Sequence, residues 1–390
     1  MDVYQQAVEF HRKHQGKLGV TPTVSVKTRE DLSLVYTPGV AQVCREVATN
    51  PEESFNLTMR GRSVAVISDG SAVLGLGNIG AVAAMPVMEG KALLFKQFGG
   101  VDAVPICVDL HTADELVAFV TAIAPSFGGI NLEDIAAPIC FEVEDRLQSL
   151  GIPVVHDDQH GTAMVVTAAL TNATKVVGKK FEDLTVVISG AGAAGLAIAQ
   201  MLLSLDRENG KLVKVEGKRV KEVIILDSKG VITADGKGLK AEFAKITNQS
   251  GRSGGLAEAI VGADAFIGVS KGGIMTPEMV KNMAQDAIVL GMANPNPEIL
   301  PEVAKAAGAA VVGTGRSDYP NQVNNSLIFP GLFKGLLKAR ITKVTPAIRQ
   351  AASAALARLV KPTADKILPN MFDPGMAEAI AEEVVKHKVV

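Results

Sequence analysis

The chain of 390 residues is 47% hydrophobic and 21% charged, which is enough apolar material for a globular protein of two domains. Its 39 Lys and Arg against 41 Asp and Glu give a formal net charge of -2, so no basic excess is available for a nucleic-acid partner. No run approaches the roughly 18 apolar residues of a membrane span, and the first residues lack the apolar stretch of a secretory signal. We therefore expect a cytoplasmic protein without membrane contact.

Short apolar, β-branched runs recur along the chain and alternate with helical patterns. The candidate strands are 64–68, 102–108, 152–156, 185–189, 222–226, 264–269, 287–292 and 309–314. Continuous apolar strands favour parallel sheets that are covered on both faces. Helical patterns lie between them at 196–205, 277–286 and 301–308. This alternation predicts an α/β fold in which the second domain is a Rossmann-type, doubly wound parallel sheet.

Three parts are expected along the chain. Residues 1–160 form an N-terminal domain for substrate and metal, and residues 161–316 form the dinucleotide-binding domain. The boundary is expected near residue 160, where a long helix begins that leads into the strand at 185–189. After about residue 317 the strand patterns stop, and 317–390 reads as helices that pack across both domains and complete the cleft.

The spacing G-x-G-x-x-G occurs twice, so context must decide which copy binds a dinucleotide. The first copy, at 75–80, is separated from its strand and reads as a close-packed loop lining a cleft. The second copy follows its strand directly and opens a helix, so backbone amides and the helix dipole would face a pyrophosphate. Its residues are Gly190, Gly192, Ala193, Ala194 and Gly195.

Asp227 ends the next strand, where a carboxylate can accept hydrogen bonds from the ribose hydroxyls. Its charge favours NAD by repelling a 2′-phosphate, but Lys229 lies two residues further on. The sequence therefore predicts NAD or NADP and leaves the preference open.

Two pairs of acids stand at the ends of predicted elements: Glu133 with Asp134, and Asp157 with Asp158. If Glu133, Asp134 and Asp158 converge, they form an oxygen-only site that suits Mg²⁺ or Mn²⁺ better than zinc. The alternative is that each pair only caps a helix, in the second case one that starts near residue 161.

His156 and His160 are four residues apart, as in a zinc protease helix. The segment 154–158 reads instead as a strand followed by a turn, which would not bring the imidazoles together.

Lys91 and Tyr36 are candidate proton-transfer groups. An apolar run follows Lys91 and would carry it inward, whereas Lys96 is expected to reach solvent. A lysine that acts as a neutral general base needs a pKa about three units below its ordinary 10.4, which burial and a nearby metal could supply. Tyr36 precedes a Thr-Pro-Gly turn and can donate a proton to an enolate. The alternatives are a lysine that extends to solvent and a tyrosine that serves packing.

Eight motifs, in this order and combination, resemble the malic enzymes of the short bacterial type. They are YTPGV (36–40), SDGSAVLGLGNIG (68–80), PVMEGKALLFK (86–96), GINLEDIA (129–136), HDDQHGTA (156–163), GAGAAG (190–195), GMANPNPE (291–298) and NQVNNSLIFPG (321–331). The resemblance runs from about residue 16 to about residue 340. It implies oxidative decarboxylation of L-malate to pyruvate and CO₂ by NAD(P)⁺ with a divalent metal, and a homodimer or higher homo-oligomer.

Carried over position by position, the resemblance implies that Lys91 is the general base, Tyr36 the general acid and Asp157 the residue that orients the base. It implies that Glu133, Asp134 and Asp158 are the metal ligands. It further implies that Asn294 contacts cofactor or malate, and that Asn324 and Asn325 do so too. One departure is Ala72, where longer, eukaryote-type members have an arginine in the loop before GLG.

Other outcomes remain open for the same site. A malolactic enzyme would retain NAD and release lactate, and an oxaloacetate decarboxylase would need no net redox change. A dinucleotide-binding module without catalysis is the alternative from a different class.

Overall fold

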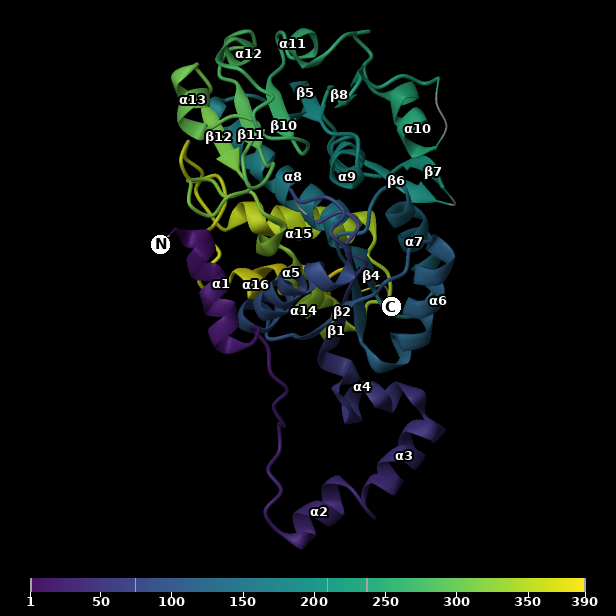
Figure 1. The fold of residues 1–390 in the computed structure, drawn as a ribbon. Helices are drawn as coiled ribbons and strands as arrows, with labels where there is room; N and C mark the ends of the chain where they lie inside the picture. The colour runs from purple at the N-terminus through teal and green to yellow at the C-terminus, as the bar shows by residue number, and fades with distance from the viewer. Residues whose placement is uncertain (1, 74, 209, 236–237, 389–390) are drawn as a thin grey trace.

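The apolar runs of the sequence form the strands of two parallel sheets that follow one another along the chain (Figure 1). The computed structural model describes residues 2–73, 75–208, 210–235 and 238–388. All eight predicted strands are present, with ends within two residues of those expected.

The first sheet has four parallel strands in the order β2-β1-β3-β4. They are β1 (Ser63–Ser68), β2 (Asp102–Cys107), β3 (Gly129–Leu132) and β4 (Val154–His156). One face packs against α6 (Ala113–Ile123) and α7 (Ile139–Leu147), and the other against α5 (Gly80–Leu94). β3 was not predicted, because its sequence GINL contains Gly and Asn, which are unfavourable in strands.

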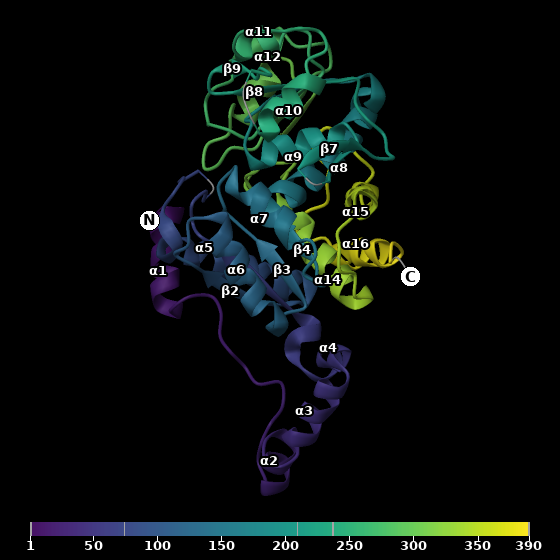
Figure 2. The same ribbon diagram turned by 90° about the vertical axis from the view of Figure 1, so that its right-hand side faces the viewer.

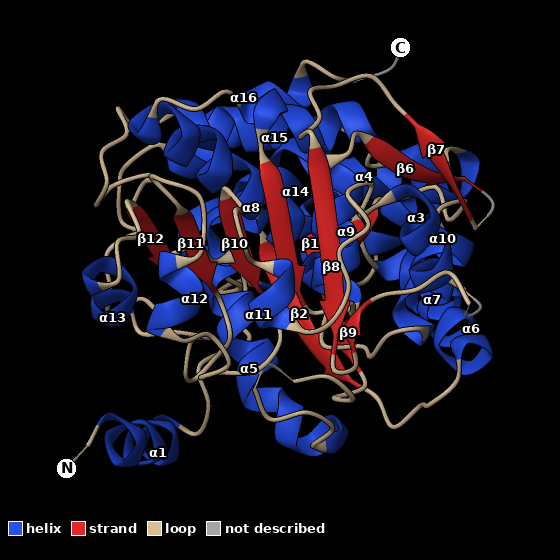
Figure 3. Cartoon of the chain, turned by 90° about the horizontal axis from the view of Figure 1, so that it is seen from above, coloured by secondary structure: helices blue, strands red, loops and turns tan. Residues whose placement is uncertain are grey.

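The second sheet has the strand order β12-β11-β10-β5-β8-β9 (Figure 3). Its strands are β5 (Thr185–Ser189), β8 (Glu222–Asp227), β9 (Gly230–Val231), β10 (Ala265–Gly268), β11 (Ile288–Gly291) and β12 (Val311–Thr314). All neighbours pair in parallel except β8 and β9. After β8 the chain crosses to β10 on the other side of β5, so the strand order reverses between β5 and β10. Ligands of doubly wound sheets bind at such a switch point.

Helices cover both faces of this sheet. Val187 and Phe266 point to one face, and Val186 and Ile267 to the other. The helices on the first face are α11 (Leu256–Ala259), α12 (Pro277–Lys281) and α13 (Pro301–Ala306). Those on the second are α8 (Asp157–Val177), α9 (Ala193–Leu202) and α10 (Leu239–Ile246). The predicted Rossmann-type, doubly wound sheet is therefore confirmed. A hairpin of β6 (Leu205–Glu208) and β7 (Lys211–Lys214) follows α9.

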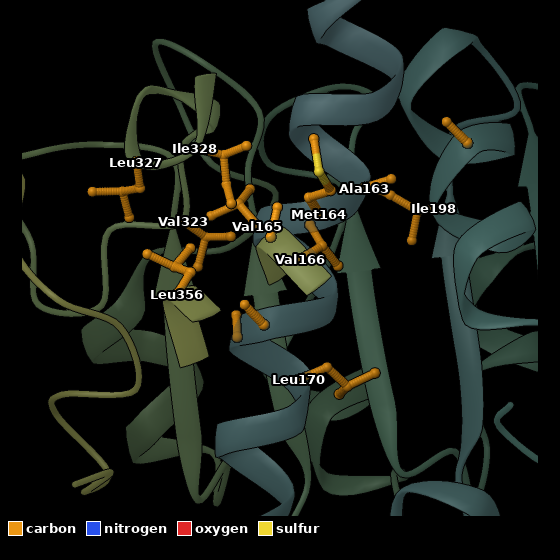
Figure 4. Packing of buried hydrophobic residues seen from close by; sticks show 14 of the residues in the cluster. Ala163, Met164, Val165, Val166, Leu170, Ile198, Val323, Leu327, Ile328 and Leu356 are labelled. Carbon is orange, nitrogen blue, oxygen red and sulfur yellow. The ribbon is translucent and has the colours of Figure 1, made fainter. Parts of the chain in front are cut away.

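Helix α8 joins the two halves of the molecule. It starts directly after β4, runs past the expected boundary at residue 160 and leads into β5. Figure 4 shows its apolar side chains packed in two directions: Val165 lies toward Val323 and Ile328, and Ala163 toward Ile198 of α9. One continuous core therefore links the two sheets.

The C-terminal helices pack across both halves, as expected. They are α14 (Phe329–Ala339), α15 (Pro346–Arg358) and α16 (Met376–Val385). The Phe329 ring of α14 lies 4.6 Å from that of Phe95, which follows α5. Ser353 of α15 donates a hydrogen bond to the Met164 carbonyl of α8 (2.9 Å).

The N-terminal segment behaves differently from the rest of the chain. It contains α1 (Val3–His14), α2 (Arg29–Val35), α3 (Val40–Thr49) and α4 (Ser54–Leu57). Helices α1, α2 and α3 bury none of their residues. α2 and α3 extend away from the two sheets in both views (Figures 1 and 2). Over the described ranges, no helix combines the length and the apolar character needed to cross a membrane.

Candidate active site

The acidic pairs of the sequence meet at the carboxyl edge of the first sheet. Glu133 and Asp134 directly follow β3, and Asp157 and Asp158 form the first turn of α8 directly after β4. Since β3 and β4 are parallel neighbours, their carboxyl ends lie side by side. Residues separated by more than twenty positions in the sequence are thereby brought together.

Lys91 lies at the centre of this group. Its side chain is 7% exposed, and its Nζ lies 2.8 Å from Glu133 Oε1 and within hydrogen-bonding distance of Asp157 Oδ2. The Nζ also lies 4.2 Å from the centroid of the Phe329 ring. The predicted burial of Lys91 is confirmed, and Lys96 reaches solvent as expected.

The charge state of Lys91 differs from the one expected of a neutral base. Burial by itself lowers the pKa of Lys91, but the charges of Asp157, Glu133 and Asp158 together raise it above its ordinary value. In this arrangement of four groups Lys91 is therefore a cation, and an amine free to accept a proton requires another positive charge among the acids.

Glu133, Asp134 and Asp158 form the donor set of a metal site. One oxygen atom of each lies within 4.8 Å of those of the other two. Burial raises the pKa of Asp134 to about 9, and the charges of Asp158 and Glu133 add to this shift. Burial likewise raises the pKa of Glu133 to about 7 and that of Asp158 to about 6. Three carboxylates that resist ionisation together can share a divalent cation, and the all-oxygen set suits Mg²⁺ or Mn²⁺.

Two local features shape this donor set. Asp134 adopts a left-handed backbone conformation (φ 53°), and its amide donates a hydrogen bond to Asp158 Oδ2 (2.8 Å). Its own buried Oδ2 has no hydrogen-bond partner. Asn131 in β3 donates to Glu133 Oε2 (2.8 Å), which orients that carboxylate. An unpaired, buried carboxylate oxygen on a residue that lies beside two other acids fits a cation ligand.

Helix α8 begins at Asp157 rather than near residue 161, so both acids of that pair belong to its first turn. The expectation of a turn at 157–158 was therefore wrong. The residue before the helix is His156 in a β conformation, with no capping hydrogen bond from its side chain. His160 lies one turn into the helix and contacts Glu144 through Nε2 (3.0 Å).

The second glycine motif forms a tight turn at the switch point of the other sheet. Gly190 has a φ of 123°, which side chains rarely adopt. A Cβ at Gly195 would lie 1.7 Å from the Gly190 carbonyl oxygen, so this glycine lets α9 start against the turn. A Cβ at Gly192 would meet nothing within 4 Å. The backbone of Gly192 therefore faces open space at the N-terminus of α9, where anions bind favourably.

One cavity of about 760 Å³ connects the two sites. Sequence-predicted residues on its wall are Lys91, Glu133, Asp134, Asp158, Gly192, Ala193, Ala194, Asn294, Asn324 and Asn325. Gly75 of the first glycine motif lines it too, which confirms the interpretation of that motif as a cleft loop. Ala72 also lines the cavity, and Lys91 is the sole Lys or Arg among the described residues of the wall.

Five predicted residues lie outside the wall of this cavity: Gly190 and Gly195, which shape the turn behind it, and Asp157, Asp227 and Tyr36. Asp157 lies behind Lys91, fully buried. Asp227 ends β8 as predicted, but its carboxylate accepts hydrogen bonds from Lys240 Nζ and the Lys229 amide, each 2.8 Å long. Tyr36 ends α2 and is 67% exposed. Within one chain, the structure does not bring Tyr36 to Lys91.

Two residues of the site were missed by the sequence analysis. Asn131 offered a signal, since it is a polar residue between two apolar ones and lies two positions before an acid. Phe329, whose ring Lys91 faces, offered none, because a phenylalanine in an apolar helix is expected in any core.

The fold and the site define a class. A Rossmann-type sheet with its glycine turn faces a buried lysine and a carboxylate metal-type site across one cavity, as in a dinucleotide-dependent oxidoreductase.

Comparison with known proteins defines the family. The malic enzyme N-terminal domain family matches residues 15–148, and the malic enzyme NAD-binding domain family matches residues 159–389. The bifunctional malic/malolactic enzyme of Bacillus subtilis is 49% identical over 395 residues, covering 99% of this chain and 93% of that protein. The NADP-dependent malic enzyme of Haemophilus influenzae is 46% identical, covering 98% of this chain but 52% of that protein.

A solved structure agrees with these relatives. The crystal structure of the NAD-dependent malic enzyme of Thermotoga maritima has 46% identity and a TM-score of 0.90, covering 97% of this chain and 98% of that one. The chain belongs to the malic enzyme family, the NAD(P)-dependent, decarboxylating malate dehydrogenases.

Proposed function

We propose that this chain oxidatively decarboxylates L-malate to pyruvate and CO₂ with NAD⁺ or NADP⁺, and that a Mg²⁺ or Mn²⁺ ion at Glu133, Asp134 and Asp158 is required. The observation that carries the proposal is the buried Lys91 beside three converging carboxylates, in the same cavity as the Gly192 turn. A module without catalysis would gain nothing from this buried group of charges, because removing charged side chains from water costs free energy.

Glu133, Asp134 and Asp158 would hold the cation beside Lys91. A divalent cation there would supply Lewis-acid polarisation of the substrate oxygens. Lys91 accepts the proton of the C2 hydroxyl and shares it with Asp157 behind it. The cation offsets the charges of Glu133 and Asp158, which otherwise raise the pKa of Lys91.

The other residues hold the reactants. The amides of Ala193 and Ala194, at the start of α9, receive the dinucleotide phosphates, and Asp227 the adenosine ribose. Asn294, Asn324 and Asn325 line the cavity, and a side-chain amide has two N–H donors for substrate carboxylates or the cofactor. In Asn294 and Asn324 one donor is used by the carbonyls of Met292 and Gly315. These asparagines take over part of the substrate binding that Ala72, which has no polar side chain, cannot provide.

Tyr36 acts as the proton donor to C3 in the site of a partner subunit. This part of the proposal rests on the exposed position of Tyr36 and on the N-terminal segment that carries it. Leu34 and Val35 beside it are 75% and 43% exposed, and α2 and α3 extend from the body without a covering layer (Figure 2). An apolar segment of this kind fits against a second copy of the chain, so the active form is a homodimer.

A mixing experiment tests this arrangement. Lys91→Ala and Tyr36→Phe chains, each nearly inactive, are unfolded, mixed and refolded together. If Tyr36 acts in the partner's site, half of the dimers are mixed and each contains one intact site, so about a quarter of the wild-type activity returns. If each chain uses its own Tyr36, no site is intact and activity stays absent, which contradicts the proposal.

The reaction itself is tested by initial rates. NADH or NADPH formation is followed with L-malate and Mn²⁺, with and without EDTA, and lactate and pyruvate are measured as products. Metal-dependent formation of reduced cofactor with pyruvate is expected. Undiminished rates in EDTA, after removal of bound metal, would contradict the metal site.

Malolactic conversion is the second candidate, because the similar Bacillus subtilis protein is named a bifunctional malic/malolactic enzyme. Lactate without net NADH in the same assay would identify that activity. Decarboxylation of added oxaloacetate in the absence of cofactor would identify the third candidate activity, that of an oxaloacetate decarboxylase.

A further inference from the structure

Glu144 is a buried carboxylate on α7 that the mechanism does not use. It is 3% exposed and lies outside the wall of the catalytic cavity, although it lines a second, polar cavity of about 360 Å³. Three groups donate hydrogen bonds to it: the His156 backbone amide (2.9 Å), His160 Nε2 (3.0 Å) and Arg207 Nη2 (3.1 Å). Three hydrogen-bond donors around one buried carboxylate stabilise its charged form, because each bond offsets part of the cost of removing the charge from water.

Two of the donors bracket the acids of the active site. His156 precedes Asp157, and His160 follows Asp158 by two positions. Glu144 therefore holds the junction of β4 and α8 at both ends of its first turn. The imidazole ring of His156 makes no hydrogen bond to Glu144 among the described residues: its buried nitrogens have no hydrogen-bond partner, and Nδ1 lies 3.7 Å from Asp158 Oδ2. The backbone amide of His156 is the anchored group.

The third donor comes from the other half of the molecule. Arg207 lies on β6, in the hairpin that follows α9 of the dinucleotide-binding domain. Its side chain is 6% exposed, pairs with Asp145 as well as Glu144 (3.1 Å each) and lies over the Phe141 ring. The next residue back, Asp206, pairs with Arg349 of α15 (2.6 Å). Glu144 thus stands where α7, α8 and the hairpin meet.

These bonds keep the carboxylate charged. Burial alone would raise the pKa of Glu144, but His160 and Arg207 lower it to about 2. A buried ion of this kind adds little net stability compared with apolar packing, so its value lies in fixing one arrangement of the groups around it.

We propose that Glu144 is a positioning residue for the metal site: it sets the backbone of the first turn of α8 so that Asp158 faces the cation and Asp157 faces Lys91, and Arg207 ties this setting to the dinucleotide-binding domain. The inference rests on the proposed metal site. Groups behind the ligands of a metal commonly tune its affinity without touching it.

The test compares Glu144→Gln with Glu142→Gln in the full-length chain. Glu142 lies on the same helix but is 60% exposed and pairs with the surface residue Arg146, so it is the matched control. Mn²⁺ binding is measured from the free-ion signal in electron paramagnetic resonance, and NADH binding from its fluorescence. Glu144→Gln should raise the Mn²⁺ dissociation constant by about tenfold to a hundredfold, with NADH affinity unchanged, and Glu142→Gln should change neither.

The outcomes separate this inference from the metal site itself. Failure of the wild-type chain to bind Mn²⁺ would overturn the metal proposal and this one with it. Wild-type binding with equal affinity in a folded Glu144→Gln chain would overturn only the positioning role. Equal losses of Mn²⁺ and NADH affinity would also overturn it, because they indicate general loosening of the fold.

Arg207→Gln is the second variant. It tests the positioning role if the Glu144→Gln chain does not fold. It should weaken Mn²⁺ binding by roughly threefold to tenfold, at or below the lower end of effects from behind a metal site. Because Arg207 acts through Glu144, the double variant should bind Mn²⁺ no more weakly than Glu144→Gln. Unchanged affinity in Arg207→Gln, or fully additive losses in the double variant, would refute the link.

Discussion

The two sides of the catalytic cavity are built on the same plan but present opposite chemistry. On one side, the carboxyl ends of β3 and β4 carry Glu133, Asp134 and Asp158, whose carboxylates converge as the proposed cation site. On the other side, the carboxyl end of β5 carries Gly190 and Gly192, where backbone amides at a helix start attract an anion.

The difference lies in what each side needs from its residues. The acidic side depends on charged atoms held in fixed positions, so it should fail when a charge is removed. The glycine side depends on the absence of side chains, so adding a methyl group to one of its glycines should impair it. Variants on the two sides therefore separate chemistry from shape.

The largest effect is expected from Lys91→Ala on the acidic side. It removes the proposed general base, so kcat should fall by about a thousandfold, within the range for loss of such a group. Cofactor affinity, which depends on the other side, should stay the same. Steady-state kinetics and NADH fluorescence measure the two quantities. Lys96→Ala is the control, since Lys96 is 61% exposed and pairs with Asp102 at the surface; equal kcat values in the two variants would contradict the role of Lys91.

Asp158→Asn should reduce the affinity for the metal ion more than it changes any other property. Because Asp158 is a proposed direct ligand, its loss should raise the Mn²⁺ dissociation constant by at least about a hundredfold, more than the loss of a supporting group. Saturating Mn²⁺ should restore part of kcat. The checks are a Mn²⁺ titration of the rate and the same titration on Asp109→Asn, whose side chain is 88% exposed. An unshifted titration for Asp158→Asn would remove it from the metal site.

Gly195→Ala and Gly192→Ala test the glycine side as a pair. A methyl group at Gly195 collides with the Gly190 carbonyl, so the free energy of unfolding should fall by about 1–3 kcal/mol. A methyl group at Gly192 meets open space, so stability should change by less than about 0.5 kcal/mol while cofactor binding weakens. Urea unfolding and NADH titration distinguish them. Equal destabilisation of both variants would show that the turn is not shaped as described.

The smallest effect is expected from a change at Lys240, which pairs with Asp227 in the dinucleotide-binding domain. Lys240 neutralises Asp227, which limits the repulsion of an NADP 2′-phosphate. Lys240→Ala should therefore raise the KM for NADP⁺ relative to NAD⁺ by roughly fivefold or less, because an exposed pair is worth at most about 1 kcal/mol. The ratio of the two KM values measures it. A ratio that moves in favour of NADP⁺ would mean that Asp227 does not face the ribose.

The sequence predicted most of what is local. Eight strands, the glycine turn after β5 and the burial of Lys91 followed from apolar runs and spacing. β3 escaped because Gly and Asn mask a short buried strand. The start of α8 was misplaced by four residues, since an Asp-Asp pair suits a turn and a first helical turn equally well.

The amino-acid order by itself determined which chemical groups are present and the period of each element, because these depend on neighbours within a few residues. Only the tertiary structure decided which of those groups meet. The parallel pairing of β3 and β4 places Asp134 beside Asp158, and the packing of α5 buries Lys91 against Glu133 and Asp157. The projecting α2 keeps Tyr36 away from the cavity of its own chain. Contacts between distant residues depend on the way whole sheets and helices pack, and no local pattern encodes that.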